Sequence, residues 1–180
     1  ISAVNINKGE LLWQLPTQSS SIYESAFSLE TSDLITDKKS LFFSNNKNQI
    51  FSIDIDTGTF NWINKVNSNN RPTLVENYLF SISMEGYLIV LDKNSGNIIR
   101  ITDIFNHFSE KKRSKIKPVG FILGSNKIYL STNNGRLIII DIFSGKMISK
   151  IKIDNEKILR PSVFNENLFI IKDNAIIKLN

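Results

Sequence analysis

SIDIDTGTFNW, residues 52–62, is the stretch of sequence that decides the fold. Within it a strand-like segment ends at Asp54, Gly58 follows four positions later, and Trp62 follows four positions after that. An Asp side chain accepts backbone N–H groups about two residues further on, and Gly adopts the positive φ that closes a tight turn. The stretch is therefore predicted to be a turn between two β-strands.

The same skeleton recurs along the chain. Two copies are complete, and two keep the acidic residue and the Gly but have another residue in place of the Trp. The copies are Asn5-Gly9-Trp13, Asp54-Gly58-Trp62, Asp92-Gly96-Arg100 and Asp141-Gly145-Ser149. A fifth copy would begin at Asn180, and successive anchors are 49, 38, 49 and 39 residues apart. Periods of this length are typical of solenoids, propellers and repeat arrays.

The residues before the anchors predict buried strands. Segments 49–53, 87–91 and 136–140 are apolar and rich in β-branched residues. No helical period separates the expected strands of a unit, so we expect four-stranded antiparallel meanders within one domain. The expected units are a partial one at 1–15, complete ones at about 33–66, 71–101 and 117–150, and a partial one at 160–180.

Composition narrows the classes of protein. The 180 residues suffice for a substantial core, and no apolar run approaches the roughly 18 residues of a membrane span. There is no Cys, which excludes disulfides, thiolate metal sites and Cys nucleophiles in this sequence. The net charge of +5 fits either an anionic partner or a proteome rich in Lys and Asn. Since the sequence opens at Ile1 within a strand motif, we expect the true N-terminus to lie upstream.

Candidate catalytic groups are sparse. His107 is the only His, so it cannot form a zinc site or a catalytic triad by itself. Asp54, Asp92 and Asp141 each open a turn in a different unit, which keeps their carboxylates apart. The sequence has no glycine-rich phosphate loop and no strand-to-helix nucleophile elbow. We expect no catalytic residue, no bound metal and no cofactor.

The recurring residues resemble the PQQ-like β-propeller repeat, and Asp54-Gly58-Trp62 and Asn5-Gly9-Trp13 carry its full signature. The resemblance covers nearly the whole chain. It implies an all-β fold of radially arranged four-stranded blades, here a fragment of a seven- or eight-bladed propeller in which Trp13 and Trp62 pack between blades. Within the group the chain is most similar to the scaffold lipoproteins of outer-membrane protein assembly. That similarity implies a non-enzymatic, periplasmic protein that binds protein partners, including outer-membrane assembly components, and is anchored to the outer membrane through its N-terminus.

Two other classes of protein are compatible with the repeat. Quinone-dependent dehydrogenases share the repeat and bind PQQ with calcium at the centre of the ring, but their adjacent cysteines are absent here and no ligand set can be assigned. A structural repeat domain of a cell-surface or sensor protein would also fit the blade signature. Nucleic-acid binding is disfavoured because the basic residues are not interleaved with exposed aromatic residues.

Basic residues are the candidate partner contacts. Arg71, Lys117 and Arg160 each precede the Pro that opens a first strand. First strands line the axis of a propeller, so we expect these cations to gather at one mouth of the channel, where they would attract an anionic segment. The neighbouring candidates are Lys111, Lys112, Arg113 and Lys115. The alternative is that each basic residue and its Pro simply end the preceding strand in solvent.

Loops are expected to share one face. In a four-stranded meander, the connection to the next unit lies on the same side as the turn between the second and third strands. The long connections 16–30 and 102–116, the latter with a possible short helix, should therefore lie beside the turns at 45–48, 84–86 and 133–135. Loops on a rigid scaffold commonly carry recognition, which makes this face a candidate interaction surface.

Overall fold

The structure is a computed structural model and describes residues 1–17, 29–173 and 175–179. Five antiparallel sheets follow one another along this part of the chain. The first contains β1 (Ser2–Val4) and β2 (Leu11–Gln14), and the second contains β3 (Ile35–Thr36), β4 (Ser40–Asn45), β5 (Gln49–Asp54) and β6 (Phe60–Asn64). The third contains β7 (Thr73–Val75), β8 (Tyr78–Ile82), β9 (Tyr87–Asp92) and β10 (Ile98–Asp103). The fourth contains β11 (Pro118–Gly124), β12 (Lys127–Thr132), β13 (Arg136–Asp141) and β14 (Met147–Lys152), and the last contains β15 (Ser162–Phe164), β16 (Asn167–Lys172) and β17 (Ala175–Leu179).

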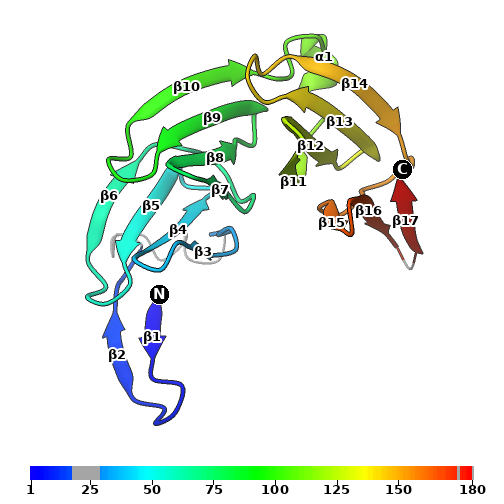
Figure 1. The fold of residues 1–180 in the computed structure, drawn as a ribbon. Helices are drawn as coiled ribbons and strands as arrows, with labels where there is room; N and C mark the ends of the chain where they lie inside the picture. Colours follow the sequence, from blue (N-terminus) through cyan, green and yellow to red (C-terminus); the bar gives the residue numbers. More distant parts are fainter. Residues whose placement is uncertain (18–28, 174, 180) are drawn as a thin grey trace.

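The sheets fan out along an arc (Figure 1). The first strands of the sheets, β3, β7, β11 and β15, lie on its concave side, and the fourth strands, β6, β10 and β14, lie on the outside. One short helix, α1 (Glu110–Arg113), interrupts the connection between β10 and β11. This architecture confirms the prediction of an all-β propeller fragment built from antiparallel meanders.

The recurring skeleton forms the turn between the third and fourth strands. Asp54 Oδ1 accepts the N–H groups of Asp56 and Thr57, at 3.1 and 2.8 Å, and the Thr57 hydroxyl at 2.8 Å. Gly58, with φ +70°, donates its N–H to the Asp54 carbonyl at 2.9 Å. Asp92 and Asp141 repeat the arrangement, each bonded by the Ser that precedes the Gly. The hydroxyl residue before the Gly (Thr57, Ser95 or Ser144) is therefore a further part of the motif, which the spacing of Asp, Gly and Trp did not predict.

Apolar cores lie between neighbouring sheets. Phe42 and Ile50 of the second sheet pack with Leu79 and Leu91 of the third, and all four are fully buried. Similar cores join the first sheet to the second, the third to the fourth, and the fourth to the last. The alternating side chains of each strand therefore fill the two junctions on either side of its sheet.

Side chains from the fourth strands complete these junctions. The Trp13 indole donates to the Ile55 carbonyl at 2.7 Å, and Trp62 makes the equivalent bond to Lys93 at 2.9 Å. Each ring lies directly against the turn Gly of the next sheet. Arg100 replaces the third Trp and donates to the carbonyl of Ile142 at 2.5 Å. Because Ile142 follows its anchor as Ile55 and Lys93 follow theirs, Arg100 preserves the hydrogen bond of the motif without the ring.

Candidate interaction face

The first strands place four residues at equivalent positions on the concave side of the arc. Each of these strands pairs with an aromatic residue of the second strand: the pairs are Ile35–Phe42, Thr73–Phe80, Ile122–Tyr129 and Ser162–Phe169. The residues two positions ahead of these pairs are Asp33, Arg71, Gly120 and Arg160, of which Gly120 lies within its strand and the other three just precede theirs. Two of the sequence-predicted cations therefore hold equivalent positions, with an acidic residue at a third.

Arg71 and Arg160 are close enough to influence one another. Burial and the charge of Arg71 both lower the pKa of the Arg160 guanidinium, whereas Asp33 acts in the opposite direction. Arg160 Nε donates to the Phe121 carbonyl at 2.9 Å. The stem of Arg160 lies over Gly120, where an added Cβ would be 2.5 Å from the Arg160 Cβ. Gly120 therefore provides the space that the Arg160 side chain fills.

Lys117 lies apart from this pair. Its side chain is exposed just before β11, and its N–H donates to Asn133 Oδ1 at 2.8 Å. Gly120, and not Lys117, occupies the position equivalent to Arg71 and Arg160. The strand register thus places Arg71 and Arg160 at equivalent positions and leaves Lys117 at the end of the strand nearest the connecting loops. A role in partner binding stays a prediction for all three residues.

One face of the arc, which we name the turn face, carries the connections between sheets and the turns between second and third strands. Ile104, in the connection after β10, donates its N–H to the Gly86 carbonyl at 3.1 Å. Asn133 Nδ2 donates to the Lys115 carbonyl at 3.0 Å. Both bonds join the connection 102–116 to the turns at 84–86 and 133–135, as the meander topology predicts. Most of the other long connection, 16–30, lies outside the described residues.

Arg113 anchors α1 to this face. Its Nη1 atom lies 2.5 Å from Asp103 Oδ2, and Nη2 donates to the Glu85 carbonyl at 3.3 Å. The guanidinium also lies over the Tyr87 ring, 5.1 Å from the ring centre. Arg113 is thus occupied in fixing the helix, which separates it from the three neighbouring lysines in the predicted basic run.

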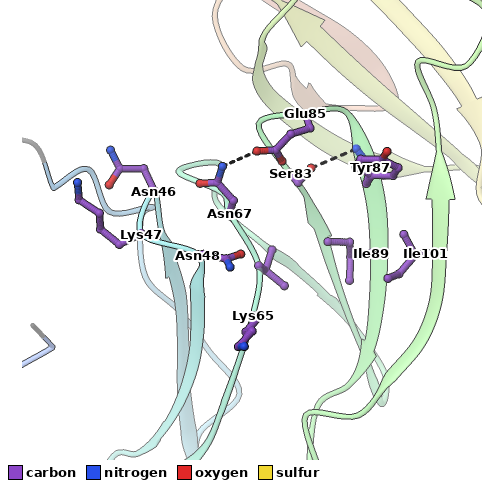
Figure 2. Close-up of a pocket in the computed structure, with 11 residues that line it drawn as sticks. Asn46, Lys47, Asn48, Lys65, Asn67, Ser83, Glu85, Tyr87, Ile89 and Ile101 are labelled. Carbon is purple, nitrogen blue, oxygen red and sulfur yellow. Dashed lines mark hydrogen bonds between the residues drawn. The ribbon is translucent and has the colours of Figure 1, made fainter. Parts of the chain in front are cut away.

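A groove of about 750 Å³ opens on the turn face between the second and third sheets (Figure 2). Lys65 and Asn67 lie on one side, Glu85 and Tyr87 on the other, and Ile101 of β10 lies beyond them. Asn67 Nδ2 donates to Glu85 Oε1 across the groove at 2.5 Å. The walls therefore present amides, one carboxylate, the side chains of Lys47 and Lys65, and apolar side chains to a ligand.

A second groove, of about 550 Å³, lies at the equivalent place on the fourth sheet. We name it the basic groove because five cations line it: Lys111, Lys112, Lys115, Arg136 and Lys150. Three belong to the predicted run, whereas Arg136 and Lys150 were not predicted. The repeat could have indicated Lys150, because it occupies the same position in its unit as Ile101 does in the preceding one. Lys150 pairs with Ile138 as Ile101 pairs with Ile89.

Radial four-stranded meanders, docked through the PQQ-like turn motif, define the chain as part of a β-propeller. A family model described as outer membrane protein assembly factor BamB matches residues 1–102, and the chain belongs to this family. No curated protein matches the sequence at a significant level.

Solved structures show the same fold at low sequence identity. BamB from Moraxella catarrhalis is 16% identical with a TM-score of 0.73, and the match covers 98% of this chain and 54% of that one. Sqt1 from Saccharomyces cerevisiae is 14% identical with a TM-score of 0.72, with 99% and 52% covered. The computationally designed Ika4 is 15% identical with a TM-score of 0.63, with 89% and 94% covered. The chain thus spans about half the length of the BamB and Sqt1 structures.

Two further features are absent from residues 1–17, 29–173 and 175–179. No helix there is long and apolar enough to cross a bilayer. Nor does this part of the chain hold a group of three His, Cys, Asp or Glu residues that could bind a metal ion.

Proposed function

We propose that this chain is a non-enzymatic scaffold that holds protein partners during outer-membrane protein assembly, on the periplasmic side of that membrane. Membership of a family described as outer membrane protein assembly factor supports this role. The propeller architecture supports it further, because a rigid fan of sheets presents loops without requiring them to form a catalytic constellation.

The observation that carries the proposal is the asymmetry between the two faces of the arc. The turn face gathers the connection 102–116, α1 and two open grooves. The opposite face carries the short Asx turns, whose polar groups are largely used in bonds within each turn, and a groove of about 510 Å³ beside Glu76 and Phe143. A partner would therefore find more shape and more available chemistry on the turn face.

Site-specific photo-crosslinking tests the proposal. Asn48 is exposed on the turn face, and Asn94 is also exposed, in the Asp92 turn on the opposite face. A photo-crosslinking amino acid at Asn48 of the full-length protein, expressed in its own cells, should capture an outer-membrane assembly component. The same probe at Asn94 should not. Capture from Asn94 alone, or from neither position, would contradict the proposal.

A further inference from the structure

The basic groove is built differently from its counterparts in the other sheets. Third strands begin with Gln49, Tyr87 and Arg136 at equivalent positions, five residues before each anchor Asp. On the fourth strands, the residues that pair with Phe51, Ile89 and Ile138 are Ile63, Ile101 and Lys150. The second and third sheets have uncharged residues at both positions, so the propeller fold does not require the two cations of the fourth sheet.

The connection brings three more cations to the same place. Lys111, Lys112 and Lys115 come from α1 and the residues after it, which Arg113 holds against Asp103 and Tyr87. Charged groups from two separate segments, the connection and the β13–β14 hairpin, therefore line one hollow. The lysines of the connection therefore meet the cations of the hairpin only because Arg113 anchors α1.

The charges in the groove lack acidic counterparts. No lining residue carries a carboxylate, and the salt bridges found in the described part of the chain involve none of the five cations. Arg136 Nη1 donates to two backbone carbonyls, those of Asn134 and Asp154, at 3.3 and 2.8 Å. These bonds fix the guanidinium but leave its positive charge uncompensated. Five like charges facing one hollow favour an anionic ligand.

Apolar side chains accompany the cations. Phe108, Ile116 and Ile138 line the same groove, and the Lys150 ammonium lies 5.1 Å from the centre of the Phe108 ring. Four of the five cations are lysines, which act as separate point charges, whereas a phosphate is commonly held by an arginine fork or a nest of backbone N–H groups. Spread charges over an apolar floor suit an extended chain with several carboxylates and an apolar side chain.

We infer that the basic groove binds an acidic peptide segment of a protein partner, with an aromatic or aliphatic side chain of that segment against Phe108 and Ile116. This inference rests on the proposed function, because it specifies the chemistry of a partner on the same face. Carboxylates of the segment pair with the lysines, and its apolar side chain displaces water from the floor of the groove.

Fluorescence anisotropy with purified protein tests this inference. The probe is a fluorescein-labelled peptide of repeated Glu-Glu-Phe units, and the control peptide has Gln in place of Glu. The groove variant is Lys112→Gln with Lys150→Gln. The matched control is Lys127→Gln with Lys146→Gln, which removes the same charge beside Asp141 at the opposite face.

The acidic peptide should bind the wild-type protein, and its affinity should fall about five- to tenfold in the groove variant, since each exposed ion pair makes a modest contribution. The matched control should bind within about twofold of wild type, and added salt should weaken binding. An equal loss of affinity in both variants would show that the net charge of the protein, and not the groove, determines binding. That result would overturn the inference. Equal binding of the Gln peptide would overturn it as well.

Vesicles of phosphatidylglycerol test whether the groove binds an anionic lipid surface and not an acidic peptide. Binding to such vesicles that requires Lys112 and Lys150, without binding of the acidic peptide, would assign the groove to a lipid surface and overturn the inference. The peptide assay needs no cellular partner, so its outcome is separate from crosslinking at Asn48. Crosslinking without peptide binding would leave the scaffold proposal standing and remove the inference alone.

Discussion

Gly96 and Trp62 provide a quantitative test of how neighbouring sheets dock. A Cβ added at Gly96 would lie 2.5 Å from Trp62 Cδ2, well inside van der Waals contact, and Gly96 has φ +73°. Gly96→Ala therefore carries two costs. The left-handed backbone costs about 1–2 kcal/mol for a residue with a Cβ, and displacement of the packed ring adds about 1–3 kcal/mol. We expect a loss of about 2–5 kcal/mol in the free energy of unfolding.

Removal of the ring should cancel one of these costs. Trp62 is half-buried, so Trp62→Ala should by itself cost about 2–3 kcal/mol, below the range for a fully buried ring. In the Trp62→Ala background, Gly96→Ala should cost only the backbone share of about 1–2 kcal/mol. The two substitutions are therefore expected to be non-additive by about 1–3 kcal/mol.

Urea denaturation followed by circular dichroism measures all four proteins of this cycle. Gly9 supplies a further control because it also has positive φ, at +70°, but no atom lies within 4 Å of an added Cβ. Gly9→Ala should therefore show only the backbone cost. Additivity of Gly96→Ala and Trp62→Ala within about 0.5 kcal/mol would refute the docking role assigned to the Trp62 ring.

Two further predictions concern the turns and α1. Backbone and hydroxyl hydrogen bonds from Ser95 lower the pKa of Asp92 below its ordinary value of 3.8. The stabilising effect of the carboxylate is therefore complete above about pH 5 and is lost as the pH falls through the lower folded-state pKa. Asp92→Asn, which keeps the acceptor oxygen as Asn5 does, should flatten the acid-induced loss of unfolding free energy measured by urea titrations at several pH values; an unchanged slope would contradict this. Arg113→Met should cost about 0.5–1 kcal/mol and speed hydrogen exchange across 104–116, because it breaks the pair with Asp103, whereas Lys112→Met should leave exchange unchanged. Equal exchange in both variants would show that Arg113 does not hold the helix.

The sequence was sufficient to predict the fold because its turn chemistry is local. Asp54, Gly58 and Trp62 each act within a few residues or on the adjoining sheet, so their spacing carries the architecture. The role of Arg100 was not predicted. The Arg100 guanidinium makes the hydrogen bond that an indole N–H makes in the other units. The sequence does not reveal this role, because it depends on the contact with the Ile142 carbonyl.

The candidate site was predicted less completely because it depends on strand register. A basic residue and Pro precede β7, β11 and β15, yet β11 spans seven residues where the other two span three, and its register shifts between Pro118 and Gly120. The same dipeptide therefore falls at a different depth in β11. Arg136 and Lys150 were not predicted as site residues for a related reason. Only the pairing of β13 with β14 brings them to one side of the hairpin.

The placement of the apolar cores between sheets has a consequence for how the molecule tolerates change. Each core is shared by two adjoining blades, so interactions run mainly between nearest neighbours, as in other repeat architectures. A substitution in the hairpin of β13 and β14 should then disturb that blade and its immediate neighbours while distant blades keep their packing. Such local coupling would let one blade acquire a new ligand preference during evolution without loss of cohesion elsewhere in the arc.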